Sequence, residues 1–257
     1  MKAKTVVGGV VDALFHKKRC WAVILAGGRG ERMGGEVPKQ FLEVGGIPVV
    51  VRTLQAFEAC SAVEGIVIVT RPAEKEIYRE YCRRYALTKV RRVTVGGETR
   101  RESAMCGLRA IDPNAPYIAI HDAARCFVTP EIIENVLRDA VLYGAAAAAT
   151  PVKDTIKITD LGGFVTQTTE RARTWAAATP QIFKTDLYRA AAYTAEEKGL
   201  DATDDCMLAE ACGFRVKLCD CGEKNIKLTT PADLKLAELI AEERDAENAA
   251  PGKGRKG

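Results

Sequence analysis

Short apolar segments alternate along this chain with longer amphipathic ones, and the alternation predicts its elements. Apolar segments that are typical of buried strands lie at 21–26, 65–70, 91–95, 117–121, 145–149 and 215–219. Segments with helical periodicity lie at 49–60, 73–86, 99–111, 130–143, 184–197, 203–212 and 231–245. Strands that alternate with helices form βαβ units. The pattern therefore predicts an α/β fold, a mostly parallel sheet with helices on both faces.

One of these strands has an ambiguous sequence. Five alanines follow Gly144 at 145–149, and alanine by itself favours a helix. The segment, however, follows a predicted helix and precedes Thr150-Pro151. That position favours a tightly packed strand.

Residues 153–175 interrupt the alternation and indicate a protruding β-hairpin arm. Two β-rich segments, 154–159 and 164–169, flank a turn at 160–163 that contains two glycines. An isolated hairpin has little core of its own. We therefore expect the arm to pack on something else, and a second subunit is the simple candidate.

Length and composition suit one globular domain. The 257 residues are 47% hydrophobic and 28% charged, which is ordinary for such a protein. We expect a single domain over 20–246, a flexible extension at 1–19 and a disordered tail at 247–257.

The charge distribution narrows the possible partners. Residues 1–20 carry five Lys or Arg and one acidic residue, which accounts for the whole net charge of +4. The rest of the chain is formally neutral, and this argues against nucleic acid as a partner. No apolar run approaches the roughly 18 residues of a membrane helix. The basic cluster Lys17-Lys18-Arg19 follows the apolar stretch, unlike that of a secretory signal, so we expect a cytoplasmic protein.

Cysteine and histidine usage gives no sign of a metal centre. The nine cysteines include no C-x-x-C pair, and the chain has only two histidines. A zinc site of familiar spacing is therefore not indicated, and the cysteines are typical of reduced, apolar thiols.

A glycine-rich loop follows the first strand and is the strongest candidate for chemistry. Backbone N–H groups of such a loop can approach a polyanion, and Arg32 and Lys39 add positive charge. A P-loop is excluded because no lysine follows the glycines at its spacing. The glycines at 28, 30 and 34 give G-x-G-x-x-x-G, one residue longer than the dinucleotide fingerprint. A dinucleotide oxidoreductase thus remains only a second hypothesis for this loop.

Two further candidate binding segments, each a corner at the end of a strand, follow later strands. Residues 96–103 place glycines before a helix start, which can bind an anion or a base or can simply cap the helix. Asp122 follows the strand at 117–121 and could hold a metal ion that bridges phosphates, or could pair with Arg125. His121 is better interpreted as a core histidine than as a catalytic one.

Together the motifs resemble one family. In order they are G-G-x-G-x-R-M, P-K-Q, G-G-x-x-R-x-x-S, H-D-A-A-R, P-V-K-D-T, R-x-x-x-W-x-x-x-T-P-Q, T-D-D and N-I-K-x-T. This series, over about 20–242, resembles the 2-C-methyl-D-erythritol 4-phosphate cytidylyltransferases of the non-mevalonate isoprenoid pathway. The resemblance implies a Rossmann-like sheet of the nucleotide-diphospho-sugar transferase type. It implies CMP transfer from CTP to the polyol phosphate with release of pyrophosphate, Mg²⁺ or another divalent cation, and a homodimer formed through the arm.

The resemblance also implies roles for individual residues. Charge on the reacting phosphates would be stabilised, and the acceptor positioned, by Arg32, Lys39, Arg171 and Lys227. The cytosine and phosphate cradle would be formed by Ala26, Gly27, Gly28, Gly30, Gly97, Glu98 and Ser103. Ribose, metal and acceptor would meet at Asp122, Ala123 and Arg125, with Asp122 as the metal ligand. The acceptor would also contact Thr155 and Thr203, and Arg171 would reach the partner's site.

Some positions depart from the family pattern, and two other functions stay open. Glu31 stands where a second basic residue is common, and Cys126 stands where proline is usual. A ribitol-5-phosphate cytidylyltransferase would have the same fold and chemistry with another acceptor. A catalytically silent CTP-binding protein is the other alternative, although it would not need both Arg171 and Lys227.

Overall fold

The central sheet confirms the predicted α/β class. The structure, a computed structural model, describes residues 18–28, 37–200 and 202–249. Within them the main sheet has seven strands in the order β11-β7-β10-β6-β1-β4-β5, and all neighbours are parallel except those of β10. The strands are β1 (Cys20–Leu25), β4 (Val63–Thr70), β5 (Val90–Val95), β6 (Tyr117–Asp122), β7 (Ala145–Pro151), β10 (Trp175–Lys184) and β11 (Lys217–Asp220).

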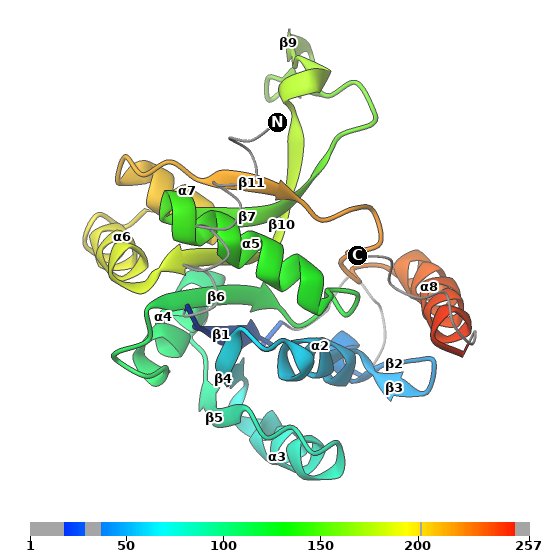
Figure 1. Ribbon diagram of the computed structural model, residues 1–257. Helices are drawn as coiled ribbons and strands as arrows, with labels where there is room; N and C mark the ends of the chain where they lie inside the picture. The colour runs from blue at the N-terminus through cyan, green and yellow to red at the C-terminus, as the bar shows by residue number, and fades with distance from the viewer. Residues whose placement is uncertain (1–17, 29–36, 201, 250–257) are drawn as a thin grey trace, which may run out of the picture.

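Helices cover both faces of this sheet, as Figure 1 shows. One buried cluster joins the sheet to α2 (Val49–Ala59), α3 (Lys75–Arg84) and α5 (Pro130–Tyr143). The cluster on the opposite face joins it to α4 (Arg100–Ala110), α6 (Thr185–Glu197) and α7 (Asp205–Ala211). A third, smaller cluster packs α8 (Pro231–Ala249) beside the two-stranded ribbon of β2 (Glu43–Val44) and β3 (Ile47–Pro48). Short 3₁₀ turns occur at η2 (Lys39–Phe41), η3 (Pro72–Glu74) and η4 (Arg171–Arg173).

The inner parallel strands β1, β4, β6 and β7 bury both of their faces. In β1, Ala22 and Ile24 pack toward α2, whereas Val23 packs toward α4. Parallel strands covered on both sides read as continuous apolar runs, because every side chain enters one layer or the other. The alanine segment obeys the same rule, since residues 145–149 are fully buried in β7. The strand predicted there is confirmed.

Strand β10 was missed by the sequence analysis. It runs antiparallel between β6 and β7, at a segment assigned partly to the arm and partly to loop. Its residues 176–180 are three alanines, a threonine and a proline, which give neither alternation nor a β-branched run. The register with β7 also shifts between Ala177 and Gln181. Tertiary packing therefore determines this strand more than local propensity does.

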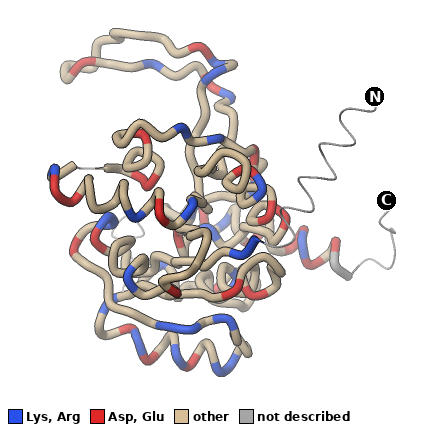
Figure 2. The backbone as a smooth tube through the Cα atoms, turned by 60° about the vertical axis from the view of Figure 1, so that its left-hand side comes forward, with Lys and Arg blue, Asp and Glu red and all other residues tan. Residues whose placement is uncertain are grey.

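The predicted arm is present. Strands β8 (Lys157–Thr159) and β9 (Val165–Thr168) form an antiparallel hairpin, shorter at each strand than expected. Figure 2 shows it extending away from the body of the molecule. Several apolar arm side chains are exposed, among them Leu161, Phe164 and Val165. An exposed apolar group of this kind is typical of an interaction surface.

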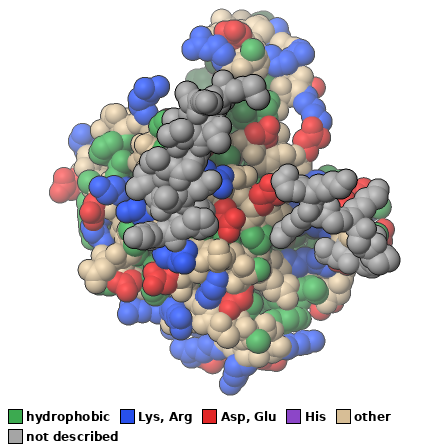
Figure 3. Space-filling view, in the orientation of Figure 1, with side chains coloured by type: hydrophobic (Ala, Val, Ile, Leu, Met, Phe, Trp, Pro, Cys, Tyr) green, Lys and Arg blue, Asp and Glu red, His purple; other side chains and the backbone are tan. Residues whose placement is uncertain are grey.

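The edge of the sheet formed by β5 is strongly basic. Strand β5 is the edge strand, and the groove beside it is lined by Arg79, Arg83, Arg91, Arg92 and Arg109. Figure 3 shows Lys and Arg side chains gathered over the lower part of the molecule, where Figure 1 places α3 and β5. Charged side chains along an edge strand oppose pairing with another sheet. Among the described helices none combines the length and apolar character needed to cross a membrane.

Gly107 determines how closely α4 approaches the sheet. A Cβ atom at this position would overlap the Val23 side chain of β1. We expect Gly107→Ala to lower the free energy of unfolding by about 1–3 kcal/mol, although alanine favours a helix more than glycine does. Urea denaturation measures this change. Arg109→Ala, on the exposed face of the same helix, is the control and should change stability by less than about 1 kcal/mol. An unchanged or increased stability of Gly107→Ala would contradict the close approach.

Candidate active site

A cleft of about 260 Å³ lies at the carboxyl ends of β1 and β6, beside the start of α4. This is the edge at which open α/β sheets bind ligands. Most of the residues that the sequence analysis assigned to the site line this cleft. They are Ala26, Gly27, Gly28, Lys39, Gly97, Glu98, Ser103, Asp122, Ala123 and Lys227.

The Asp122 carboxylate, at the end of β6, is paired with three cations. Lys227 Nζ lies 2.7 Å from Oδ2, Arg100 Nε 3.7 Å from Oδ1, and Arg125 Nε 4.0 Å from Oδ2. Burial by itself would raise the pKa of this carboxyl. The field of Lys227, Arg100 and Arg125 outweighs burial and lowers the pKa to about 2. Asp122 is therefore ionised at neutral pH.

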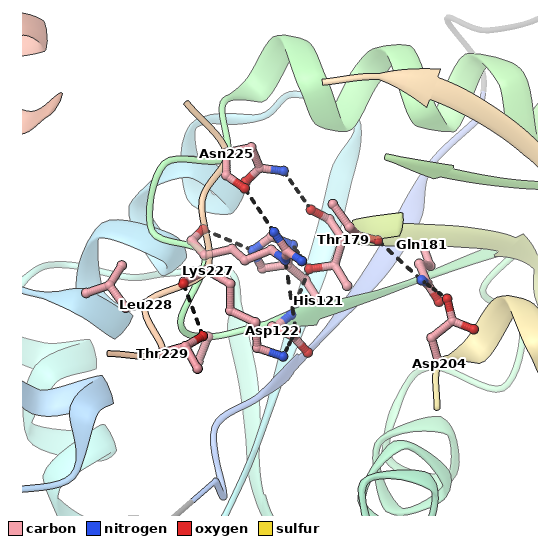
Figure 4. Close-up of polar contacts among 12 residues, drawn as sticks. His121, Asp122, Thr179, Gln181, Asp204, Asn225, Lys227, Leu228 and Thr229 are labelled. Carbon is pink, nitrogen blue, oxygen red and sulfur yellow. Dashed lines mark hydrogen bonds and ion pairs between the residues drawn. The ribbon is translucent and has the colours of Figure 1, made fainter. Parts of the chain in front are cut away.

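Segment 225–229 brings Lys227 to the cleft, and hydrogen bonds fix it to the loop after β6. Leu228 N–H donates to Ala124 O over 2.9 Å, and Arg125 Nη1 donates to Asn225 O over 2.9 Å. Asn225 Nδ2 donates to Thr179 O over 2.9 Å, which ties the segment to β10, as Figure 4 shows. Lys39 Nζ donates to Leu228 O over 3.0 Å. The two lysines are thus held at the same cleft by the same segment.

His121 is a structural residue, as its sequence context suggested. It has no exposed surface, and its ring centroid lies 5.0 Å from that of Phe57. His121 Nε2 lies 3.2 Å from Arg125 O, which can only accept, so the ring proton lies on Nε2. Nδ1 then accepts from Thr179 Oγ1 (3.0 Å), and Thr179 Oγ1 in turn accepts from Asp122 N–H (3.1 Å). Burial lowers the pKa of His121 to about 3, and the ring is neutral.

The glycine corner before α4 is both a helix cap and a wall of the cleft. Thr99 Oγ1 accepts from Glu102 N–H, and the Glu102 carboxylate accepts from the N–H groups of Thr99 and Glu98. A side chain at Gly97 would overlap that of Glu102. The corner therefore requires glycine for close approach.

Other assigned residues lie outside this cleft. Arg125 is mostly buried and lines a neighbouring hollow of about 480 Å³ at the base of the arm. Thr155 and Arg171 are exposed on the arm, where Arg171 Nη2 donates to Thr155 Oγ1 over 3.0 Å. Thr203 is exposed just before α7. Gly30 and Arg32 lie outside the described residues.

Five residues that line the cleft were not assigned to the site from the sequence: Leu25, Gln40, Thr99, Arg100 and Ala124. Arg100 and Gln40 are the two with long polar side chains. Arg100 stands within the motif at 96–103, so its position after the glycines was a usable signal. Gln40 follows Lys39 in the P-K-Q motif, which was a usable signal as well; it is nearly buried, and its amide Nε2 donates to the Glu74 carboxylate.

The fold and the cleft together define an α/β nucleotidyltransferase. Comparison with known proteins identifies the group within that class. Over residues 20–243 the chain matches the family described as 2-C-methyl-D-erythritol 4-phosphate cytidylyltransferase, and it belongs to this family.

Similar proteins agree with this assignment. Curated enzymes of that name from Pelotomaculum thermopropionicum and Geobacillus kaustophilus are 41% identical over 232 residues and 44% identical over 226 residues. The alignments cover 90% and 88% of this chain and 98% of each relative. The crystal structure of 4-diphosphocytidyl-2C-methyl-D-erythritol synthase from Anaerococcus prevotii has a TM-score of 0.80 and 29% identity, covering 90% of this chain and 99% of that one. A 2-C-methyl-D-erythritol 4-phosphate cytidylyltransferase from Thermus thermophilus has a TM-score of 0.70 and 31% identity, covering 86% and 98%.

The buried neutral His121 makes stability depend on pH. Between its unfolded pKa of 6.5 and its folded pKa of about 3, the unfolded chain binds the extra proton. Its contribution to stability is therefore complete above pH 6.5 and is lost as the pH falls, by up to about 1.4 kcal/mol per pH unit. We expect His121→Gln to reduce this slope between pH 6.5 and 5, as measured by urea denaturation. His16→Gln, which removes the other histidine, is the control; a slope lost in that variant instead would contradict the assignment.

Proposed function

We propose that this chain transfers CMP from CTP to 2-C-methyl-D-erythritol 4-phosphate, forming 4-diphosphocytidyl-2-C-methyl-D-erythritol and pyrophosphate. The observation that carries the proposal is the cleft itself. It combines a glycine-lined wall with Lys39, Lys227 and an ionised Asp122, in a chain of this family.

The chemistry requires positioning and charge stabilisation more than acid–base groups. A phosphate oxygen of the acceptor attacks the α-phosphorus of CTP in line, and the bond to the bridging oxygen breaks to release pyrophosphate. A phosphate monoester is already nucleophilic at neutral pH, and His121 is buried away from the cleft. Lys39 would stabilise charge on the α-phosphoryl group and Lys227 would hold the acceptor phosphate. Arg32 would act with Lys39, on the resemblance alone.

The cleft suits a nucleotide with a small, polar base. Ala26, Gly27, Gly28 and Ala123 leave space along β1 and β6, and Gly97, Glu98 and Ser103 form the opposite wall. Backbone N–H and C=O groups there can recognise the amino and carbonyl edge of cytosine. Arg125 would act from beneath the site by holding Asp122 and segment 225–229.

The donor set fits a divalent cation that arrives with the triphosphate. The described residues contain no group of three or more metal-ligating side chains that could hold an ion alone. Mg²⁺ commonly takes one or two carboxylates and completes its shell with substrate phosphates and water. Asp122 would supply the carboxylate. A bound Mg²⁺ would neutralise part of the triphosphate charge.

We infer that the arm completes the site of a second subunit. Arg171 and Thr155 are paired on the arm and do not line the cleft of their own chain. The exposed apolar side chains around them support a homodimer contact. We also infer one catalytic domain over 20–246. The nine free cysteines support a cytoplasmic location, where thiols stay reduced.

Parallel assays distinguish the three candidate functions. Pyrophosphate release from CTP is measured with Mg²⁺ and either 2-C-methyl-D-erythritol 4-phosphate or ribitol 5-phosphate. We expect a strong preference for the methylerythritol substrate. Preference for ribitol 5-phosphate would contradict the proposed acceptor, and CTP binding without release from either would indicate the silent binder.

Lys39 provides a direct test of charge stabilisation. We expect Lys39→Ala to keep the fold and lower kcat by about 10²–10³-fold, which corresponds to about 3–4 kcal/mol. Steady-state kinetics and circular dichroism measure the two effects. Lys89→Ala is the matched control, because Lys89 also donates to a backbone carbonyl, that of Cys60, away from the cleft. Equal kcat values for the two variants would refute the role of Lys39.

Mixing inactive subunits tests the shared site. Homodimers of Arg171→Ala and of Lys39→Ala should both be inactive. In a mixed dimer, one site combines the intact arm with the intact cleft, so random exchange should restore about a quarter of wild-type activity. Differently tagged subunits verify the exchange by co-purification. Confirmed exchange without recovery would show that Arg171 acts in its own subunit.

A further inference from the structure

A buried ion pair joins the starts of two helices on the same face of the sheet. Arg100 is the first residue of α4, and Asp205 is the first residue of α7. Arg100 Nη1 lies 2.7 Å from Asp205 Oδ2, and the Asp205 side chain has no exposed surface. Among the described residues, Arg100 is the cation that forms an ion pair with this carboxylate. The reaction described above makes no use of Asp205.

Neighbouring groups hold the Asp205 carboxylate in place. The Tyr188 hydroxyl donates to Oδ1 over 2.6 Å. Gln181 Oε1 accepts from the N–H groups of Asp205 (2.9 Å) and Cys206 (3.1 Å), and Gln181 Nε2 donates to Asp204 Oδ2 (2.8 Å). Figure 4 shows Gln181 and Asp204 joined beside the end of β6. Asp205 is thus a fixed anchor and not a mobile surface carboxylate.

Arg100 connects this anchor to the cleft. Its Nε lies 3.7 Å from Asp122 Oδ1, and its side chain is 29% exposed and lines the cleft. One guanidinium therefore lies between a buried carboxylate and the carboxylate of the site. A planar guanidinium can serve two acceptors in different directions, whereas an ammonium is a point charge.

The pair also connects the cleft to the segment that precedes α7. The corner that precedes Arg100 contributes Gly97 and Glu98 to the nucleotide wall, and Ser103, three residues after Arg100 in α4, also lines it. The segment that precedes Asp205 carries Thr203, the proposed acceptor contact. The Arg100–Asp205 contact therefore joins the nucleotide wall to the segment that carries Thr203.

We propose that Asp205 is a positioning residue, which holds Arg100 against Asp122 and fixes the acceptor segment at 202–205 relative to the bound nucleotide. This inference rests on the proposed function, because it takes Thr203 as an acceptor contact. Loss of a purely structural ion pair would lower stability and affect the kinetics of the two substrates equally. Loss of a positioning pair affects kcat/KM for the acceptor more than KM for CTP.

A double-mutant cycle tests the proposal through both substrates. Wild type, Asp205→Asn, Arg100→Met and the double variant are compared in kcat/KM for the acceptor and in KM for CTP. We expect Asp205→Asn to lower kcat/KM for the acceptor by about 10–100-fold while KM for CTP changes by less than about threefold. The double variant should lose no more than the worse single variant, because the two residues act as a unit. Additive losses, or equal losses for the two substrates, would overturn the proposal.

Arg100→Lys separates charge from geometry. Lysine keeps a cation near Asp205, so we expect a melting temperature close to that of wild type. It cannot serve both carboxylates, so kcat/KM for the acceptor should remain as low as in Arg100→Met. Full recovery of activity in Arg100→Lys would overturn the bridging role.

Arg101→Met is the matched control. Arg101 follows on the same helix turn and donates to Ala195 O and Leu200 O, outside the cleft. We expect it to lower stability without a selective loss for the acceptor. The same acceptor-selective loss in Arg101→Met would assign the effect to general loosening of α4.

Thermal unfolding keeps this test separate from the proposed function. Wild-type turnover is measured first and decides the proposed function by itself. The melting temperatures of the four proteins in the cycle measure the interaction between Arg100 and Asp205 and do not depend on turnover. Arg100→Met leaves a buried unpaired carboxylate and should lower the melting temperature by about 5–10 °C, and Asp205→Asn added to it should recover at least half of that loss. Additive losses in melting temperature would show that Arg100 and Asp205 do not interact, and this would overturn the proposal even if wild type showed no turnover.

Discussion

An anion at the end of a buried strand must be neutralised by its surroundings, and Asp122 imposes this requirement on the whole site. Its carboxylate is nearly enclosed, and it would be strongly destabilising without partners. Lys227 comes to it from the segment before α8, Arg100 from the start of α4 and Arg125 from the loop that follows β6. Three parts of the chain that are distant in sequence therefore meet at one group.

The same requirement prepares the cleft for a charged substrate. Cations that are already gathered and oriented need little rearrangement when a triphosphate and a phosphate ester bind between them. The backbone hydrogen bonds of segment 225–229 keep Lys39 and Lys227 at the cleft. The anchor at Asp205 extends this arrangement into α7, beyond the groups that face the cleft. The cations gathered around Asp122 thus both stabilise the structure of the site and prepare it for reaction, and no single catalytic group does both.

Much of this could be predicted from the sequence, for physical reasons. Parallel strands buried on both faces give continuous apolar runs, so β1, β4 and β6 were evident, and the valines of the edge strand β5 were enough to indicate it as well. Glycines and charged residues directly after those strands must meet at one edge of the sheet, so most residues of the cleft were evident as well. Strand β10 was not evident, because its small residues have no period and its place depends on β6 and β7. The Arg100–Asp205 pair was not evident either, because a contact between two helix starts leaves no local pattern.

The charge state of Asp122 is the central claim, and its titration tests that claim most directly. Aspartate labelled with ¹³C at the side-chain carboxyl reports ionisation through its chemical shift, and Asp122→Asn identifies the signal. In chelator-treated protein, with folding monitored in parallel, the signal should stay that of an ionised carboxylate from pH 7 to 4, because the pKa is about 2. A midpoint at pH 4 or above in the folded protein would mean that the cations do not control this carboxylate, and it would contradict the account.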